Sequence, residues 1–329
     1  MKLFTSVRSQ RVTSLGERRL IGRIRGWLGD VCPPAPFGMG DDCAVLPRPG
    51  RSLLITTDPV IAGRHFDGAV PARAVGAKLL KRNLSDIAAM GGTPRTAVVS
   101  LALAPATSVA WLRSFYAGLA HCARRHRVKV VGGDVTQALD GFFGAFLTLH
   151  GEATAARVIT RQGARAGDQL YVTGALGGSR LGHHFTFEPR LREGEWLARR
   201  PEIRAMMDLS DGLAKDVREL VPPPLAADLL PDEIPVAADA RRWAGRTGGS
   251  PLEHALRDGE DYELLIVVDG RRSADGLLKN WRRHFPRLPL TRIGSIVRGS
   301  SAKYRLGANL LADGGFEHLR PDSARARSR

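Results

Sequence analysis

The sequence has only three cysteines, Cys32, Cys43 and Cys122, among its 329 residues. They are widely spaced and form no CxxC pair, which excludes a disulfide framework and a structural zinc site. We expect all three to serve as small apolar residues.

The sequence also lacks any uninterrupted apolar run of about 18 residues, so it predicts no membrane-spanning helix and no membrane partner. Residues 1–17 are basic and polar, and they lack the apolar stretch that a secretory signal needs. Both absences favour a cytoplasmic protein.

Acidic residues are the minority charge: 33 Asp and Glu against 49 Lys and Arg give a formal charge of +16. Such a surface attracts nucleic acid, or nucleotides and phosphates, or is simply a solvated basic surface. Because no aromatic-basic RNA motif, helix-turn-helix pattern or zinc finger is present, we expect no specific nucleic-acid partner.

The length predicts two domains. We expect an α+β architecture with an N-terminal domain over 14–150, a C-terminal domain over 151–320, and loose tails at 1–13 and 321–329. Apolar periodicity predicts strands over 43–46, 52–57, 96–103, 128–131, 144–151, 167–174 and 262–268. It predicts helices over 20–28, 72–90, 108–125, 211–220 and 273–284. The 128–131 strand is expected to stop at Gly132-Gly133, and the prolines of 33–36 to form a stiff connector.

Aspartates recur where apolar stretches meet glycine or small residues. They are Asp41 and Asp42, Asp58, Asp86, Asp134, and Asp208 with Asp211. If these element ends converge, the carboxylates repel one another and hard divalent cations relieve the repulsion. Oxygen ligands without clustered His or Cys favour Mg²⁺ over zinc.

Magnesium with few protein ligands is usually shared with phosphate oxygens, so the pattern points to phosphoryl transfer. Gly132-Gly133 permits close backbone approach to a phosphate, and Arg161 is a candidate phosphate clamp. The motif GxxxxGK[ST] and the protein-kinase motifs are absent, which excludes those two classes. Taken singly, an aspartate before glycine is more often a turn residue or a helix cap, while Asp86 also fits a surface position on its helix and Asp134 a simple turn.

The ordered series of motifs resembles the thiamine-monophosphate kinase family over nearly the whole chain. The matching segments are 39–46, 56–66, 83–91, 131–134, 160–164, 168–174, 207–213 and 259–264. The wider PurM-like superfamily includes aminoimidazole-ribonucleotide synthetase. The resemblance implies a two-domain PurM-like fold and a homodimer formed through the N-terminal mixed sheets. It also implies a C-terminal α/β domain, with ATP in the cleft between the domains.

Roles for individual residues follow from the resemblance. The implied Mg²⁺ ligands, for several ions, are Asp42, Thr56, Thr57, Asp58, Asp86, Asp134, Asp208 and Asp211. The implied ATP contacts are Gly133, Asp134, Arg161 and Ser210. The implied contacts to thiamine monophosphate are His65 near the phosphate, Glu260 at the thiamine moiety and Phe316 against the aromatic ring. Each of these three also has a purely structural interpretation: His65 as a hydrogen-bonded histidine, Glu260 as a loop charge and Phe316 as part of the apolar core.

The family likeness implies direct in-line transfer of the ATP γ-phosphoryl group to thiamine monophosphate, giving thiamine diphosphate. The acceptor is already anionic, so no general base is expected. Metal-assisted transfer involving Asp58, Asp134 and Asp211 is expected instead.

Three features depart from the family pattern: an N-terminal extension, a shortened segment between Gly178 and Pro189, and Asp258 in place of a common glycine. We expect the first two to lie away from the metal motifs. Two alternatives remain, another superfamily enzyme with a different acceptor and a catalytically silent nucleotide- or RNA-binding protein.

Overall fold

The computed structural model describes residues 7, 14, 17–28, 37, 41–46, 50–299 and 303–316. The proline connector at 33–36, Cys32 and nearly all of both expected tails lie outside the described residues. Helix α1 (Glu17–Leu28) includes the expected N-terminal helix. Among the described helices, none is both long enough and apolar enough to cross a bilayer.

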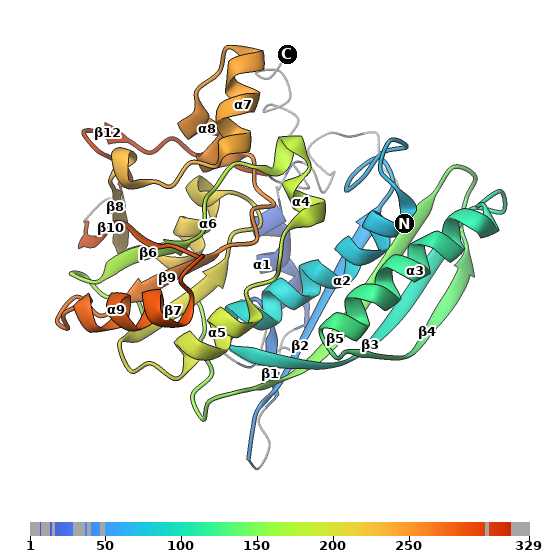
Figure 1. Cartoon of the computed structure of the whole chain (residues 1–329), viewed down its shortest axis with the longest axis horizontal. Helices are drawn as coiled ribbons and strands as arrows, with labels where there is room; N and C mark the ends of the chain where they lie inside the picture. Colours follow the sequence, from blue (N-terminus) through green and yellow to red (C-terminus); the bar gives the residue numbers. More distant parts are fainter. Residues whose placement is uncertain are drawn as a thin grey trace.

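The first half of the chain forms a five-stranded mixed sheet in the order β1-β2-β5-β3-β4 (Figure 1). Its strands are β1 (Ala44–Leu46), β2 (Leu53–Ile61), β3 (Gly92–Leu103), β4 (Lys129–Gln137) and β5 (Phe143–Ala153). All neighbours are antiparallel except β3 and β4, which run parallel. Helices α2 (Ala72–Ala89) and α3 (Val109–Arg125) cover one face and enclose the apolar core.

Helices α2 and α3 pack with their backbones in direct contact. A Cβ atom at Gly76 would lie 1.9 Å from the carbonyl oxygen of Phe115, and one at Gly118 would lie 1.8 Å from that of Arg73. Only glycine leaves room for this approach, which brings both helices onto the sheet. Cys43 and Cys122 are buried free thiols, as expected of small apolar residues.

The expected end of the 128–131 strand is wrong, because β4 continues through Gly132 and Gly133 to Gln137. The register between β3 and β4 shifts at Ala97/Val98, which accommodates one extra residue on β4. Beyond the shift the backbones approach so closely that a Cβ at Gly133 would lie 1.9 Å from the Val99 carbonyl oxygen. The glycine therefore allows close packing of β3 and β4 at this point, and its expected contact with ATP stays a prediction.

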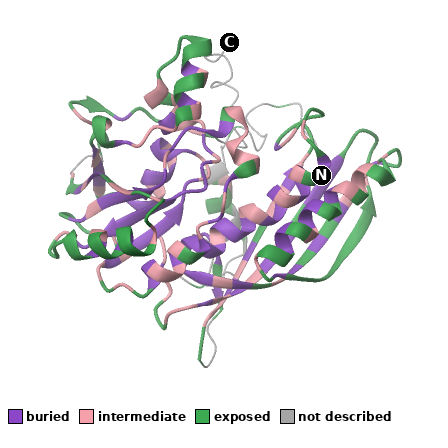
Figure 2. Ribbon diagram, viewed as in Figure 1, coloured by how far each residue is buried: buried purple, intermediate pink, exposed green. Residues whose placement is uncertain are grey.

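The second half forms a seven-stranded sheet in the order β12-β11-β8-β10-β6-β9-β7. Its strands are β6 (Gln169–Thr173), β7 (Ile203–Asp208), β8 (Leu225–Leu229), β9 (Leu264–Val268), β10 (Leu290–Arg298), β11 (Arg305–Leu306) and β12 (Asn309–Leu310). The short helices are η4 (Ser179–Leu181), α4 (His183–Thr186), α5 (Leu191–Ala198) and η5 (Pro231–Glu233). The others are α6 (Leu213–Leu220), α7 (Ala238–Thr247), α8 (Pro251–Arg257) and α9 (Asp275–His284). Apolar clusters on both faces bury the central strands (Figure 2).

Helix α2 joins the two halves, because it contacts β7 and α5 of the second half while it covers the first sheet. Its last residue, Ala89, belongs to the apolar cluster of the second sheet together with Met206 and Trp281. The C-terminal turn of α2 therefore lies where both halves meet. The expected α+β fold is confirmed, whereas the domain division near residue 150 stays a prediction.

Candidate functional site

Three carboxylates from distant parts of the sequence meet at this junction. Asp42 precedes β1, Asp86 lies in the last turn of α2, and Asp208 ends β7. Each offers an oxygen atom, and these oxygens all lie within 4.8 Å of one another. We call these three residues the carboxylate cluster. Its convergence is what the aspartate pattern predicts for Asp42, Asp86 and Asp208.

Hydroxyl groups and one guanidinium hold the carboxylate cluster in place. Ser85 Oγ donates to Asp208 Oδ2 at 2.6 Å, and Thr56 Oγ1 donates to Asp86 Oδ2 at 2.5 Å. Arg161 donates to both oxygens of Asp42, from Nη2 at 2.7 Å and from Nε at 3.1 Å. Because Ser85 and Asp86 are adjacent on α2, this one turn of helix links Thr56 in the first sheet to Asp208 in the second.

Burial makes the ionised form of the cluster costly. It raises the pKa of Asp208 to about 8, with the charge of Asp42 adding to the effect. Burial and then the charge of Asp58 hold the pKa of Asp86 well above its usual range. Next to the cluster, burial and Asp42 raise the pKa of Asp41 to about 7. Arg161 alone does not balance these charges, so the all-oxygen donor set suits a hard divalent cation such as Mg²⁺.

Neighbouring positions on β2 face opposite sides of the sheet, as strand geometry requires. Asp58 faces α2, where Arg82 Nη2 donates to its Oδ1 at 3.3 Å. Thr57 faces the other side, because its Oγ1 donates to the Leu147 carbonyl at 3.1 Å and accepts from Thr148 at 3.2 Å. Thr56 and Asp58 are therefore on the side of the carboxylate cluster, and the side chain of Thr57 is not.

Gly133 and Asp134 lie on β4, the edge strand farthest from β1. In the register of the sheet, Asp134 on β4 is paired with Ser100 on β3, and Ser100 is paired with Phe146 on β5. Phe146 is paired in turn with Pro59 on β2, the residue after Asp58. Three strand spacings separate Asp134 from β2, which is roughly 14 Å. Its partner in the described chain is Thr136, whose hydroxyl donates to Asp134 at 3.2 Å. Within one chain, Asp134 does not join the carboxylate cluster.

Asp211 and Phe316 are connected through Lys215. Lys215 Nζ lies 2.6 Å from Asp211 Oδ2 and donates to the Phe316 carbonyl at 2.8 Å. The backbone N–H of Phe316 donates to the Asp211 carbonyl at 2.9 Å. The carbonyl of Ser210 accepts from the Glu260 N–H at 2.7 Å. The segment of Ser210 and Asp211 thus holds two expected substrate residues, Phe316 and Glu260, next to the end of β7.

His65 and Glu260 meet at Lys78, a residue that the sequence did not single out. Lys78 Nζ lies 2.6 Å from Glu260 Oε1 and donates to the His65 carbonyl at 3.1 Å. The Nδ1 of His65 accepts from the Ile61 N–H at 3.0 Å, which fixes the imidazole ring. The two expected substrate residues are therefore brought together from opposite halves of the protein.

Comparisons with known proteins agree with this geometry. Residues 40–153 match the family model described as AIR synthase related protein, N-terminal domain. The chain is 33% identical over 323 residues to the thiamine-monophosphate kinase of Rhodopirellula baltica, covering 94% of this chain and 99% of the relative. The chain belongs to the thiamine-monophosphate kinase family.

Two further relatives extend this result. The thiamine-monophosphate kinase of Aquifex aeolicus is 32% identical over 311 residues, which is 88% of this chain and 94% of that protein. The solved structure of AaThiL complexed with AMPPCP and TMP has a TM-score of 0.80 and 29% identity, and it covers 94% of this chain and 99% of that one. The fold expected from the resemblance is confirmed.

The segment between Gly178 and Pro189, which we expected to be shortened and to lie away from the metal motifs, contacts the expected substrate residue Glu260. Its short helix α4 places His184 Nδ1 2.7 Å from Glu260 Oε2 and 2.6 Å from Lys78 Nζ. Asp258, which departs from the family pattern near Glu260, lies at the end of α8 and forms contacts with His254 and Arg180 there. Its carboxylate lies 2.9 Å from His254 Nδ1 and 3.3 Å from Arg180 Nε.

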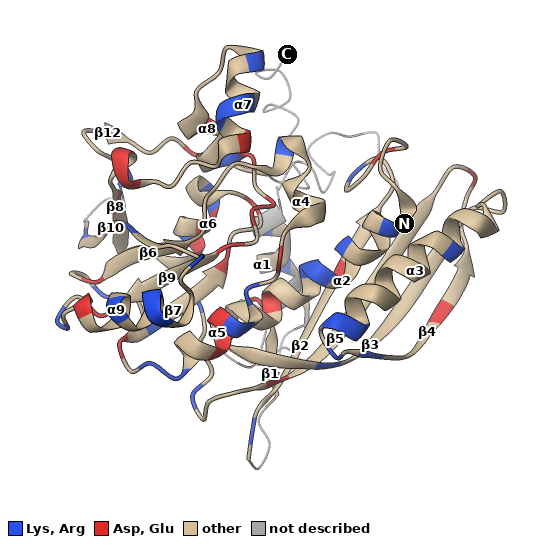
Figure 3. Cartoon of the chain, in the orientation of Figure 1, with Lys and Arg blue, Asp and Glu red and all other residues tan. Residues whose placement is uncertain are grey.

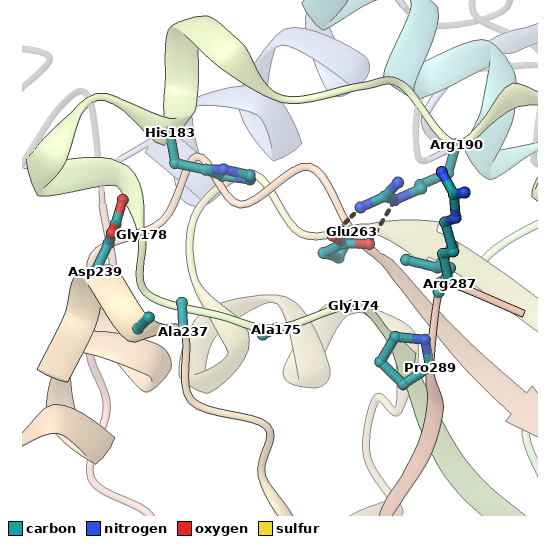
Figure 4. Close-up of a pocket in the computed structure, with 12 residues that line it drawn as sticks. Gly174, Ala175, Gly178, His183, Arg190, Ala237, Asp239, Glu263, Arg287 and Pro289 are labelled. Atoms are coloured by element: carbon teal, nitrogen blue, oxygen red, sulfur yellow. Dashed lines mark hydrogen bonds and ion pairs between the residues drawn. The ribbon is translucent and has the colours of Figure 1, made fainter.

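A cavity of about 340 Å³ lies in the second half, where Gly174, Ala237 and Pro289 are among the residues that line it (Figure 4). Arg190 pairs there with both oxygens of Glu263, and His183 and Arg287 also line it. None of the expected site residues is among the twelve residues that line this cavity. The carboxylate cluster, and not this cavity, is therefore the candidate active site.

Proposed function

We propose that the protein is a thiamine-monophosphate kinase that transfers the γ-phosphoryl group of ATP to thiamine monophosphate. The observation that carries this proposal is the meeting of Asp42, Asp86 and Asp208 within 4.8 Å at the junction of the two halves. Membership in the family supplies the substrates, and the AaThiL structure with AMPPCP and TMP supports them.

In this proposal the carboxylate cluster, Thr56 and Asp58 hold Mg²⁺, and Asp211 holds a further ion at the end of β7. Bound Mg²⁺ neutralises the charge on the phosphates of both substrates. Arg161 and Ser210 contact ATP, while His65, Glu260 and Phe316 orient thiamine monophosphate. Because the acceptor is an anionic phosphate oxygen, the protein needs only to align the two substrates and exclude water, without a general base.

We also infer that the enzyme is a homodimer formed through its five-stranded sheet. The sheet face opposite α2 and α3, which carries Val98, Ser100, Phe146, Thr148 and Thr57, is here called the open face. Val98 is 40% exposed and Phe146 is 39% exposed on it. Exposed aromatic and aliphatic groups on one face favour burial against a second copy.

The two edges of this sheet supply a second argument. Among the residues that the structure describes, β1 pairs with β2 only at Leu53–Ile55 and leaves the rest of that edge unpaired, and every residue of β4 at the other edge is exposed. Two copies that turn their open faces toward each other and join along these edges would bring the β4 edge of one beside the β2 edge of the other, so that Asp134 reaches past this edge to the α2 side on which Asp58 lies. In this arrangement Asp134 serves the site of the partner subunit, which accounts for its distance from Asp58.

The basic surface does not favour the alternative of a nucleic-acid-binding protein. In Figure 3, Lys and Arg are scattered over helices and loops of both halves and do not gather in one stripe. Positive charge that is scattered in this way attracts small phosphate compounds, but it does not form the continuous basic surface that binds a nucleic-acid backbone. We place the enzyme in the cytoplasm, since the free thiols of Cys43 and Cys122 suit a reducing compartment.

The function is tested by incubating the protein with ATP, Mg²⁺ and thiamine monophosphate and separating the products by chromatography. We expect thiamine diphosphate and ADP in equal amounts. Asp86→Asn should lower kcat/KM by about 100-fold or more, because it removes a charge that acts on the transferring group. The exposed Asp140→Asn is the matched control and should retain activity. ADP formed without thiamine monophosphate would indicate another acceptor, and salt-sensitive RNA retention without turnover would indicate a binding protein.

The dimer is tested by mixing two inactive variants, Asp58→Asn and Asp134→Asn. If Asp134 acts in the partner's site, half of the randomly formed dimers are mixed and each regains one site, so about a quarter of wild-type activity returns. A mixture of Asp58→Asn with Asp42→Asn is the control and should stay inactive. Light scattering should show a dimer that Phe146→Asp dissociates and Val109→Asp, at an exposed position on α3, does not. A monomeric wild type, or no recovery on mixing, would refute the arrangement.

A further inference from the structure

Lys78 is a fully buried cation at the junction of the two halves. Its side chain has 0% exposure, although it lies in the middle of α2, between Ala77 and Leu79. A buried lysine is costly unless each N–H finds a partner, and an ammonium group has three N–H donors. Three polar atoms lie around this one: the ammonium donates to the His65 carbonyl and pairs with Glu260 Oε1, and His184 Nδ1, 2.6 Å from Nζ, donates to Glu260 Oε2.

These three partners come from three separate segments. His65 follows β2, Glu260 lies in the loop before β9, and His184 lies in α4 of the shortened segment. The ring of Phe185 completes the enclosure, with its centroid 4.7 Å from Nζ. One ammonium group therefore sets the spacing between His65 and Glu260.

The backbone at Glu260 is also held in an unusual conformation. Glu260 has a φ of 55° and Tyr262 a φ of 54°, both in the left-handed region that residues with side chains seldom adopt. Their N–H groups donate to the Ser210 and Leu209 carbonyls at 2.7 and 2.8 Å. Strained backbone persists where the surroundings fix it, and such residues gather at ligand sites. Lys78, His184 and the Tyr262 hydroxyl, which donates to Glu260 Oε1 at 3.2 Å, fix the Glu260 carboxylate.

We propose that Lys78 is a positioning residue for thiamine monophosphate: it holds the Glu260 carboxylate and the His65 loop at the separation that the cationic ring and the phosphate of the substrate require. This inference rests on the proposed function and adds a specificity element to it. His184 assists, so the shortened segment takes part in substrate recognition. Glu260 stays ionised in this setting, since hydrogen bonding to His184 and the charge of Lys78 outweigh burial and lower its pKa.

The inference predicts a selective defect. Lys78→Met should raise the KM for thiamine monophosphate by about 10-fold or more, because the carboxylate and the loop lose their common anchor. The KM for ATP should stay within about two-fold, since neither Arg161 nor the carboxylate cluster contacts Lys78. Glu260→Gln should have a similar effect, and the double variant should be no worse than the more affected single variant, as for residues that act as one unit.

Lys81→Met is the matched control. Lys81 lies one turn further along α2 and donates to the carbonyls of Phe185 at 3.2 Å and Phe187 at 2.6 Å in the same segment. It therefore joins α2 to this segment as Lys78 does, but no contact with Glu260 or His65 involves it among the described residues. If the two lysine variants show the same kinetics, Lys78 is only a structural contact and the inference is wrong.

Calorimetric binding of thiamine monophosphate in the presence of AMPPCP separates this inference from the proposed function, because it needs no turnover. If the wild type binds no thiamine monophosphate, the proposed function fails. If the wild type and Lys78→Met bind it equally, only the inference fails. Should Lys78→Met not fold, His184→Ala decides: weaker binding of thiamine monophosphate with unchanged AMPPCP binding supports the inference, and unchanged binding of both overturns it.

Discussion

Asp208→Asn should stabilise the metal-free protein, although it removes a hydrogen-bonded buried residue. Asp208 is 2% exposed, and its oxygens share a 4.8 Å neighbourhood with those of Asp42 and Asp86. Two unit charges at 4.8 Å repel by about 3.5 kcal/mol at an effective dielectric constant of 20. The asparagine keeps the shape of the side chain, and its Oδ1 can still accept from Ser85.

Protonation limits the size of the gain. The pKa of Asp208 is raised to about 8, so the carboxyl group is largely protonated at pH 7. Holding a carboxyl group of ordinary pKa 3.8 protonated at pH 7 costs about 4 kcal/mol, which is the upper bound on the gain. We therefore expect Asp208→Asn to add about 1–4 kcal/mol, or roughly 2–8 °C in Tm.

Scanning calorimetry in EDTA and in excess MgCl₂ measures both effects. The wild type should gain stability with Mg²⁺ by mass action, and Asp208→Asn should gain much less. Asp140→Asn, at an exposed position between β4 and β5, is the control and should shift the metal-free stability by less than about 0.5 kcal/mol. A metal-free Asp208→Asn protein that melts below the wild type, or one that keeps the full Mg²⁺ response, would refute the reasoning.

Three other predictions follow from the same contacts. The first concerns pH in EDTA. Because the pKa of Asp41 is raised to about 7 and that of Asp208 to about 8, their contribution to the free energy of unfolding is present at low pH and is lost as the pH rises through these values. Tm should therefore fall between about pH 5.5 and about pH 8, and it should fall less in Asp208→Asn. Arg161→Met should raise the KM for ATP by about 10-fold or more. It should also lower Tm, because Asp42 stays buried without its bidentate partner, and adding Asp42→Asn to the same chain should restore Tm. Gly76→Ala should cost more than about 2 kcal/mol in urea unfolding because its Cβ meets the Phe115 carbonyl, while Gly276→Ala, with open space in α9, should be neutral or stabilising.

Apolar periodicity predicted the first half of the fold well, because most of its helices and strands, β4 excepted, have a buried face. Strand β7 was missed, since five of its six residues are buried and no alternation marks it as a strand. Strand β10 was missed for a related reason: its burial varies irregularly from residue to residue where it is paired on both sides. Such strands are defined by their neighbours in the sheet, which local sequence does not reveal.

The candidate site, like the fold, could be predicted from the sequence only in part. The aspartates of the carboxylate cluster stand at element ends, and the convergence of these ends was a hypothesis from the sequence. It holds for Asp42, Asp86 and Asp208 but, within one chain, not for Asp134. Lys78 reads in sequence as an ordinary exposed helix lysine, and only the packing of α4 and Glu260 against α2 reveals its burial. The place of Asp134 on the distant edge strand could not be predicted either, since a Gly-Gly-Asp sequence fits a turn as well as a strand.

The most direct test of the central claim is an anomalous difference map from crystals grown with Mn²⁺ and AMPPCP. The account predicts a metal peak about 2.0–2.4 Å from carboxylate oxygens of Asp42, Asp86 and Asp208, with the nucleotide phosphates on its open side. A nucleotide bound elsewhere, or a map with no metal between these three carboxylates, would contradict it.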